Sequence, residues 1–301
     1  MPSRAAPAHA GTGAEKAEAP VVGEDRRAGL LRRRGGPIAL VVFVVIFLIP
    51  VIGVLLTSLK TNAEIARRGI WSATGNLTID NYLEVWRNAN TGRYLINSLQ
   101  VTGPAVAVSI IGGTLIGYTV AKLRIRGSAF ILLVVLSGLF VPPQVLLVPL
   151  FTIFNDLNLL DTLWPMIIVH SAVGLSITSL VMRNFFDQIP DSLRSAARID
   201  GANEGQVLLK VMLPLARPAI AALATLQFTF IWNDFLYPLV FTTDDDVRTI
   251  MLGLLAAQGQ FTVAYGNQAA LAVIASIPTV LVFLAFQKHF IRGLLAGAIK
   301  G

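Results

Sequence analysis

Six long stretches with almost no charge constrain this chain more than any other feature of its sequence. A helix needs about 20 mainly apolar residues to cross roughly 30 Å of hydrocarbon. Stretches that meet this requirement are residues 37–56, 99–121, 128–154, 163–182, 218–241 and 269–286. Asp234 is the single charged residue within them. The sequence therefore predicts an all-α membrane protein with six transmembrane helices.

The composition supports a membrane protein and argues against a nucleic-acid partner. Hydrophobic residues make up 54% of the chain and charged residues 14%, and the mean hydropathy is +0.69. This is too apolar for an ordinary soluble domain. The net charge is +7, but the arginines cluster beside the apolar stretches, as expected for membrane topology. We therefore expect a lipid bilayer around this chain and no nucleic acid.

Basic residues are distributed unevenly between the two sides that six spans define. Of the 24 Lys and Arg residues, 18 fall on the side that holds both termini and six fall on the other side. Positive charge favours the cytoplasmic side, so both termini are predicted to be cytoplasmic. Residues 1–36 lack apolar periodicity and are expected to form a disordered basic tail. Residues 37–301 then form one six-span domain.

The most polar long segment between two apolar runs extends from Pro190 to Pro218. We refer to it as the 190–218 hairpin, because its pattern predicts two short helices joined by a turn. The first helix shows helical spacing at Leu193, Ala196, Ala197 and Asp200.

Turn and capping residues mark the boundaries of these two helices. Gly201 stands where a left-handed cap would stop the first helix without steric cost. Asn203 and Gln206 form a plausible capping pair for the second helix, which Pro214 is expected to end. An apolar hairpin this short does not form a core of its own, so it needs a groove in a partner. The alternative is an amphipathic surface segment whose basic residues lie near anionic headgroups.

Enzyme signatures are missing from the sequence. It contains no G-x-x-x-x-G-K-[ST] phosphate loop, so the chain is not expected to bind ATP by itself. It also contains no G-x-S-x-G and no H-E-x-x-H. The three histidines, His9, His170 and His289, are far apart in sequence and suggest no metal site. We therefore assign no catalytic residue, metal ligand or cofactor to this chain, and interpret His170 as a packed polar residue.

Asn233 and Asp234, within the stretch FIWNDFLYPL, form the sharpest polar feature inside a predicted span. A carboxylate in hydrocarbon is expensive, so it must face water or a partner. One interpretation is a hydrogen bond that packs helices or subunits together, and the other is a role in a transport pathway. The prolines of FVPPQVLLVPLF predict in addition that the third span is kinked.

The segment SAARIDGANEGQVLLKVMLP resembles the cytoplasmic "EAA" coupling loop of the membrane subunits of ABC importers. Ser195 stands where that loop usually has Glu, which removes a charge that would contact the partner. The residues that match the pattern are Ala196, Ala197, Asp200, Gly201, Leu213 and Pro214. The sequence pattern ARIDGA, followed by LP and then by WND, is most similar to that of the carbohydrate-importer permeases, the branch that includes the maltose permeases. The resemblance extends from about residue 80 to residue 301.

This resemblance implies a type I permease fold of six transmembrane helices with a cytoplasmic two-helix coupling loop. It implies import of a sugar or related polyol in a bacterial inner membrane. The expected partners are a second homologous permease, two ATPase subunits that bind ATP and Mg, and an extracytoplasmic sugar-binding protein. The matched residues and Ser195 would contact the ATPase. In maltose-type permeases the final residues reach toward the ATPase, which makes Lys300 and Gly301 contact candidates.

Two other functional classes stay open at this point. An ion-coupled secondary carrier would use Asp234 as a proton or sodium site, and it predicts uptake by this chain alone. A non-transporting membrane scaffold would use the 190–218 hairpin to recruit a cytoplasmic protein. Dependence on a separate ATPase would exclude the carrier, and substrate flux through a reconstituted complex would exclude the scaffold.

Overall fold

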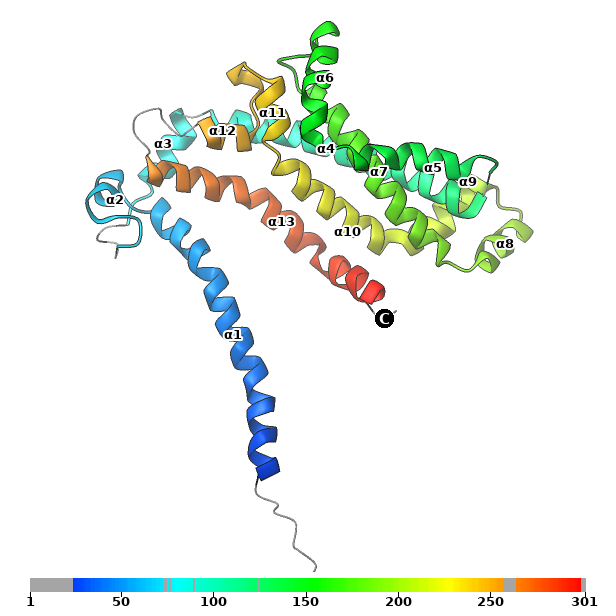
Figure 1. Cartoon of the computed structure of the whole chain (residues 1–301), viewed down its shortest axis with the longest axis horizontal. Helices are drawn as coiled ribbons and strands as arrows, with labels where there is room; N and C mark the ends of the chain where they lie inside the picture. Colours follow the sequence, from blue (N-terminus) through cyan, green and yellow to red (C-terminus); the bar gives the residue numbers. More distant parts are fainter. Residues whose placement is uncertain are drawn as a thin grey trace, which may run out of the picture. The chain divides into compact units, whose positions relative to one another are not determined.

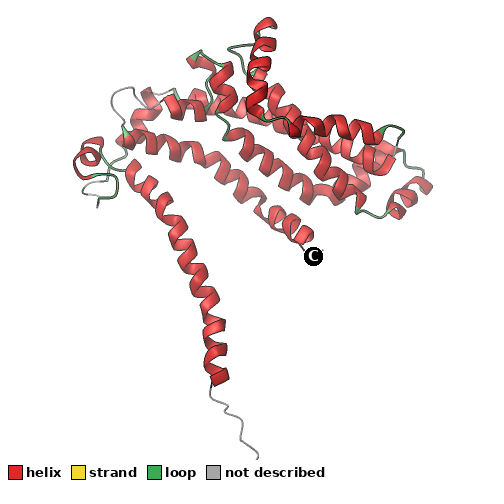
Figure 2. Ribbon diagram, in the orientation of Figure 1, coloured by secondary structure: helices red, strands yellow, loops and turns green. Residues whose placement is uncertain are grey.

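A computed structural model describes residues 24–72, 75, 77–88, 90–123, 125–256 and 264–298, and the regular elements within these ranges are helices (Figure 2). The chain divides into two compact units, residues 1–52 and 53–301. Helix α1 (Glu24–Ser58) runs through this boundary. Of the tail predicted to be disordered, residues 1–23 lie outside the described ranges and residues 24–36 are helical.

The second unit contains the remaining helices. In chain order they are α2 (Asn62–Arg68), α3 (Asp80–Asn88), α4 (Thr91–Tyr118) with a π-helical turn (Thr119–Leu123), α5 (Ser128–Ser137) with a 3-10 turn (Gly138–Phe140), α6 (Pro143–Asp156), α7 (Trp164–Asp187), α8 (Asp191–Ile199), α9 (Glu204–Val207) with a π-helical segment (Leu208–Met212), α10 (Leu213–Trp232), α11 (Leu236–Phe241), a 3-10 turn (Asp245–Val247), α12 (Ile250–Ala256) and α13 (Tyr265–Ala298).

Five helical stretches among the described residues are long and apolar enough to cross a membrane. They are Gly36–Ser58, Thr91–Leu123, Trp164–Asp187, Glu204–Trp232 and Tyr265–Lys288. The sixth predicted span is divided between α5 and α6, which meet at a bend of 100°. The total is therefore six if this bent pair counts as one span. Figure 1 shows α6 turning sharply away from α5.

The bend between α5 and α6 has its cause in two consecutive prolines. Pro142 has extended backbone angles, φ −57° and ψ 133°, and Pro143 is the first residue of α6. Neither residue has a backbone N–H to continue the hydrogen bonds of α5, and the residue before a proline is forced out of the helical region. The prediction of a kinked third span is confirmed, and the kink is large enough to break the helix.

The predicted end of the second hairpin helix at Pro214 is wrong. The chain continues from α9 through the π-helical segment into α10, and residues Glu204–Trp232 form one span. Pro214 lies in the first turn of α10. The π-helical segment precedes this turn, and a first-turn residue needs no N–H donor, so the proline is accommodated without a stop.

The predicted fifth span, residues 218–241, is also corrected at its outer end. Helix α10 ends at Trp232, and residues 233–235 separate it from the short α11. Asn233 and Asp234 therefore lie in a break between two helices rather than within one.

Helices α4, α7 and α10 pack against one another at the centre of the second unit. Helices α4 and α7 lie close together at Gly117, where a Cβ atom would lie 2.7 Å from the backbone nitrogen of Arg183. A small residue is therefore required there.

At the α8 end of the unit, far from α3 and α12 (Figure 1), buried apolar side chains from α4, α7, α9 and α10 form what we name the hairpin-end core. Its members are Tyr118, Ala121, Met182, Phe186, Ile189, Val207, Leu208, Met212, Ala216, Ala219 and Leu223.

Candidate functional site

The first helix of the 190–218 hairpin ends as its sequence predicts. Helix α8 (Asp191–Ile199) is followed by Gly201 at φ +87°, in the left-handed region. The backbone N–H of Ala202 donates to the carbonyl of Ala197 at 3.0 Å, and that of Gly201 donates to Arg198 at 3.1 Å. These two bonds are a Schellman motif, which satisfies carbonyls that the end of a helix leaves free. The predicted left-handed cap is confirmed.

The second helix begins with the predicted capping pair. The side chain of Asn203 accepts the backbone N–H of Gln206 at 2.9 Å, and the side chain of Gln206 accepts the N–H of Asn203 at 3.0 Å. This reciprocal capping box fixes the direction in which the chain enters α9. The turn between the two helices is therefore fixed at both ends by local hydrogen bonds.

The residues at the positions of the coupling-loop pattern differ in their exposure. Ser195, Ala196 and Asp200 are exposed, whereas Ala197 packs against the hairpin-end core. Gly201 is exposed at the turn. Farther along, Leu213 packs against the hairpin-end core, and Pro214 is exposed.

Ile199 also lies on the outer surface of α8, and the sequence analysis did not identify it. Ile199 is 86% exposed. It lies three positions after Ala196, and residues at this spacing are neighbours on a helix surface. The signal that could have identified it is an isoleucine in a segment that is otherwise polar on this face. Together, Ser195, Ala196 and Ile199 form what we name the α8 outer face.

Glu204 joins the two helices of the hairpin by charge. Arg194 on α8 donates two hydrogen bonds to its carboxylate, Nη2 to Oε1 at 2.6 Å and Nε to Oε2 at 3.2 Å. The same carboxylate accepts the hydroxyl of Tyr118, on α4, at 3.0 Å. The hydrogen bonds that Arg194 donates to Glu204 raise the pKa of the Arg194 guanidinium. Sequence reasoning missed Glu204 because its partners are 10 and 86 residues away.

Lys122 makes a second connection between α4 and the hairpin. Its ammonium group donates to the carbonyl oxygen of Ile189 at 2.6 Å and to Oδ1 of Asp191 at 2.6 Å. The Lys122 side chain is 3% exposed, whereas that of Asp191 is 61% exposed. A lysine is rarely buried to this degree unless it is paired, so this contact holds the start of α8 in place.

Asp234 is engaged within its own chain. It lies in the break before α11, where its carboxylate accepts the backbone N–H groups of Leu236 at 3.1 Å and Tyr237 at 3.3 Å. Its Oδ2 also lies 3.3 Å from Nε2 of His170, on α7. His170 is buried, as the sequence analysis expected, and packs edge-on against Tyr237. Asn233 is exposed and donates to the carbonyl of Thr229 at 2.7 Å.

A small pocket lies beside this pair. Polar side chains on its wall include Ser98, Thr102 and Thr249, and the Thr249 hydroxyl has no hydrogen-bond partner in the described part of the chain. The pocket has a volume of about 10 Å³, which is near the size of one water molecule and far below that of a sugar. The His170–Asp234 pair therefore lines a space that can hold about one water molecule. A role of Asp234 in a transport pathway stays a prediction.

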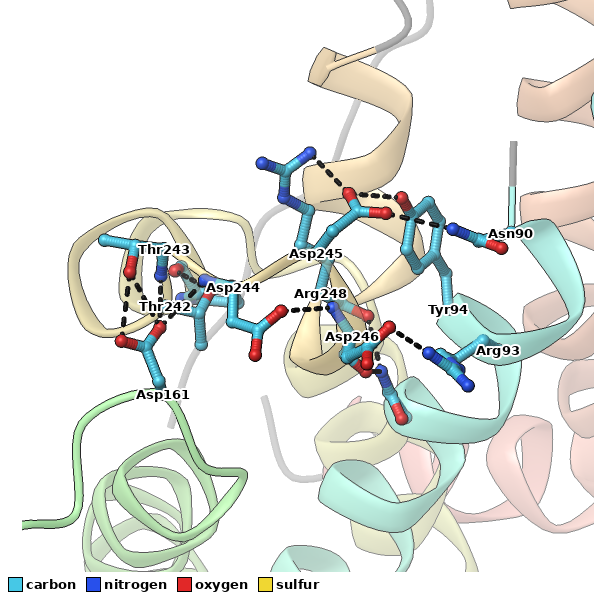
Figure 3. A network of polar contacts seen from close by, with 12 residues as sticks. Asn90, Arg93, Tyr94, Asp161, Thr242, Thr243, Asp244, Asp245, Asp246 and Arg248 are labelled. Atoms are coloured by element: carbon cyan, nitrogen blue, oxygen red, sulfur yellow. Dashed lines mark hydrogen bonds and ion pairs between the residues drawn. The ribbon is translucent and has the colours of Figure 1, made fainter. Parts of the chain in front are cut away.

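The opposite end of the second unit carries a polar network around the loop before α12 (Figure 3). Asp161 accepts the backbone N–H groups of Thr243 at 2.5 Å and Asp244 at 2.9 Å. These backbone hydrogen bonds hold the pKa of Asp161 below its usual value. The Asp161 backbone N–H also donates to the carbonyl of Phe241 at 3.1 Å. Asp161 thus fixes the residues that follow α11.

Helix α4 holds the other half of the same loop. Asp245 accepts the hydroxyl of Tyr94 at 2.7 Å and the side-chain amide of Asn90 at 3.0 Å (Figure 3). The hydrogen bond from Tyr94 lowers the pKa of Asp245. Arg93 pairs with Asp246 on this surface. The loop is therefore anchored to α4 and to the α6–α7 connection.

Two predicted contact residues, Lys300 and Gly301, lie outside the described residues. In the ranges that the structure describes, no group of three or more His, Cys, Asp or Glu side chains is placed to hold a metal ion.

These features define a multi-pass helical membrane protein with a braced two-helix projection at one end. Residues 113–295, more than half of the chain, match the family described as "Binding-protein-dependent transport system inner membrane component". The chain belongs to this family of transport subunits. The predicted ABC importer permease is thereby confirmed, and family membership favours it over the carrier and the scaffold.

Curated relatives and a solved structure agree with this assignment. The chain is 33% identical to the sulfoquinovosyl glycerol transport system permease protein SmoH of Agrobacterium fabrum, over 84% of this chain and 89% of the relative. It is 32% identical to the diacetylchitobiose uptake system permease protein NgcG of Streptomyces coelicolor, over 87% of both chains.

A chain in the crystal structure of a bacterial ABC transporter that imports the polysaccharide alginate has the same fold. The TM-score is 0.75 at 23% identity, over 91% of this chain and 100% of that chain. This likeness confirms the predicted type I permease fold.

Proposed function

We propose that this importer subunit carries a sugar or oligosaccharide and that its 190–218 hairpin docks into an ATPase subunit. The substrate class is supported by the two relatives, whose named substrates, sulfoquinovosyl glycerol and diacetylchitobiose, both contain sugar units. In this proposal the chain pairs with a second homologous permease. Two separate ATPase subunits bind ATP and Mg, and an extracytoplasmic binding protein delivers the sugar.

The observation that carries the docking proposal is the exposure of Ile199 on a hairpin that is otherwise braced. An exposed isoleucine side chain keeps its apolar surface in water, and burying a side chain of this size is worth about 1.5–3 kcal/mol. The Schellman motif, the capping box and the Arg194–Glu204 pair fix the backbone beneath it. The α8 outer face is thus presented to a partner with little conformational entropy left to lose.

Charge placement supports the orientation of this hairpin. The 18 basic residues on the side of the hairpin and the termini favour a cytoplasmic position, where an ATPase would meet it. The opposite end, with the network around Asp161 and Asp245, would then face the binding protein.

Exposed apolar side chains support the proposal that lipid and a second permease surround this chain. Helix α5 has no buried residue of its own, and Phe230 on α10 is strongly exposed. Surfaces of this kind require hydrocarbon or another apolar subunit.

The mechanism follows from the connection of the hairpin to the spans. Helix α8 is joined to α7 through residues 188–190, and α9 continues into α10. Closure of the ATPases around the hairpin would therefore pull directly on two spans, which rotate to open the pathway to the other side. The chain itself supplies no hydrolytic chemistry in this scheme.

Site-specific photocrosslinking tests the docking. A photoreactive residue replaces Ile199 in the assembled complex in native membranes, and a matched variant carries it at Phe230, which is also exposed but lies in a predicted span. We expect an adduct with the ATPase from position 199 and none from position 230. Adducts of position 199 with lipid alone would support the surface-segment alternative and contradict the docking.

Uptake into proteoliposomes tests the substrate class. The complex with its binding protein is supplied with Mg-ATP and with radiolabelled diacetylchitobiose, another disaccharide or an amino acid. We expect ATP-dependent uptake of at least one of the sugars, and uptake of the amino acid alone would contradict the proposal.

A further inference from the structure

We propose that Tyr118 and Lys122 are positioning residues that tie α4 to the 190–218 hairpin, so that a movement of the hairpin carries α4 together with α7 and α10. This inference rests on the proposed docking of the hairpin to an ATPase. It adds a third helix to the moving part and names the two side chains that connect it.

Chain connectivity makes a non-covalent tie necessary. The hairpin is joined covalently to α7 on one side and to α10 on the other. Helix α4 ends more than 60 residues before the hairpin begins. The polypeptide gives α4 no direct link to the hairpin. Any force that reaches α4 must therefore pass through side-chain contacts with the hairpin or through the packing of α4 on α7 and α10.

Lys122 holds the start of α8. Its ammonium group is buried and has two acceptors, both at 2.6 Å: the carbonyl of Ile189 and the carboxylate of Asp191. Charge-assisted hydrogen bonds are short and about twice as strong as neutral ones. Movement of α8 away from α4 would leave a buried ammonium without these partners, which is strongly unfavourable.

Tyr118 holds the start of α9 through Glu204. The hydroxyl of Tyr118 donates to Oε2 of Glu204 at 3.0 Å, and Arg194 on α8 occupies both oxygens of the same carboxylate. One carboxylate thus joins α4, α8 and α9. Tyr118 is the last residue of α4, and Lys122 lies in the π-helical turn that follows it. Each of them contacts a different helix of the hairpin, α9 through Glu204 and α8 through Asp191.

Apolar packing keeps the fold intact without these polar contacts. The ring of Tyr118 packs edge-on against Phe186 on α7, with ring centroids 5.5 Å apart. Ala121 is also buried in the hairpin-end core. Replacing the hydroxyl or the ammonium group with apolar atoms therefore removes the ties and leaves the packing of α4 on α7.

Spin-label distances in the complete complex test the tie. One label replaces Leu115 on α4 and the other replaces Ser192 on α8, both of which are exposed. In the wild-type background we expect the same narrow distance distribution before and after addition of Mg-ATP. In the double variant Tyr118→Phe, Lys122→Met we expect the distribution to broaden or shift on addition of Mg-ATP. An unchanged narrow distribution in the double variant would overturn the proposal.

Hydrolysis of Mg-ATP supplies a functional readout. The double variant loses three charge-assisted hydrogen bonds, one from Tyr118 and two from Lys122. The stimulation of hydrolysis by the binding protein should therefore fall by at least about tenfold, while basal hydrolysis is kept. Lys288→Met and Tyr265→Phe are matched controls, because both side chains are exposed and make no hydrogen bond among the described residues. Equal losses in these controls would overturn the proposal.

A second pair of variants tests the proposal if the double variant Tyr118→Phe, Lys122→Met does not assemble into the complex. Asp191→Ala removes the carboxylate that Lys122 contacts, and Glu204→Ala removes the acceptor of the Tyr118 hydroxyl together with the Arg194 pair of the hairpin. Both changes leave the side chains of α4 and of its π-helical turn unchanged. They should reproduce the loss of stimulation, and wild-type stimulation in this pair would overturn the proposal. The crosslink from position 199 to the ATPase should persist in the double variant Tyr118→Phe, Lys122→Met, which keeps the Arg194–Glu204 pair. Its absence from the wild-type complex would instead contradict the proposed docking, which separates the two failures.

Discussion

The carboxylate of Asp234 lies 3.3 Å from Nε2 of His170 and also accepts two backbone N–H groups at the start of α11. His170 belongs to α7, and Asp234 follows the end of α10. One side chain therefore caps a short helix and joins two spans. This arrangement accounts for a carboxylate in an apolar stretch without requiring contact with a substrate or an ion.

Two substitutions of Asp234 separate these structural contacts from a role in ion transport. Asp234→Asn keeps an oxygen for the α11 N–H groups and is expected to leave ATP-driven uptake within about twofold of wild type. Asp234→Ala removes every acceptor and should lower stability by about 1–3 kcal/mol, because buried donors then lose their partner. Thermal unfolding and uptake by the purified complex measure both effects. Ion-driven uptake by this chain alone, abolished in Asp234→Asn, would restore the secondary-carrier hypothesis.

Substitutions of Gly201 test the turn of the 190–218 hairpin. A Cβ atom at this position meets nothing within 4 Å, so the penalty comes from the positive φ alone. That penalty is about 1–2 kcal/mol for most residues, larger for the β-branched Val, and small for Asn. We therefore expect Gly201→Val to reduce uptake per ATP hydrolysed and Gly201→Asn to retain it.

The control for Gly201 is Gly205→Ala, four residues away in α9, where φ is not positive and the added methyl group is 3.4 Å from the Asn203 side chain. This variant should keep wild-type coupling. Normal uptake per ATP in Gly201→Val would contradict the coupling role of the turn.

Local signals explain which parts of this structure the sequence predicts. The caps of the hairpin depend on residues close together in sequence, namely Gly201, Asn203 and Gln206. Their capping roles can therefore be predicted directly from the pattern. The apolar stretches likewise locate the spans because length and hydropathy are local properties.

The features that sequence reasoning missed depend on distant partners or on geometry between elements. Glu204 and Lys122 have partners up to 86 residues away, and no local period marks them. The break at Asp234 lies inside a continuous apolar stretch, where hydropathy carries no information about a helix end. Pro214 was misinterpreted because a proline in a helical pattern usually ends a helix, whereas here it lies in a first turn.

Acid should release the loop that follows α11. Hydrogen bonds from Thr243 and Asp244 lower the pKa of Asp161 below its ordinary value of 3.8. A carboxyl group with a lowered pKa in the folded state contributes stability above its unfolded pKa, and this contribution is lost as pH falls through the folded value. Stabilisation by Asp161 should therefore be constant from neutral pH to about pH 5. It should begin to fall near pH 3.8 and be lost once the pH drops below the lowered pKa of the folded state.

The difference in unfolding temperature between wild type and Asp161→Asn measures this contribution. It should be constant at neutral pH and shrink in the acid range. Asp156→Asn is a matched control at the end of α6, since Asp156 is exposed and makes no hydrogen bond to the described residues. A difference for Asp161→Asn that grows as the pH falls would contradict the assigned hydrogen bonds.

The contact between α4 and α7 gives a last prediction, on stability rather than transport. A methyl group on Gly117 would lie 2.7 Å from the backbone nitrogen of Arg183 and 2.8 Å from Cβ of Met182. Backbone atoms within a packed helix do not move aside as a flexible side chain would, so Gly117→Ala must push α4 and α7 apart. Overpacking of this kind costs about 1–3 kcal/mol.

Gly103, on the same helix, is the control, because a Cβ atom there would have nothing within 4 Å. The variant Gly103→Ala should unfold at or above the wild-type temperature, since alanine is the better helix former. Thermal unfolding of the two variants side by side therefore reports the helix contact itself, and equal stability of the two would show that α4 and α7 are not in close contact at Gly117.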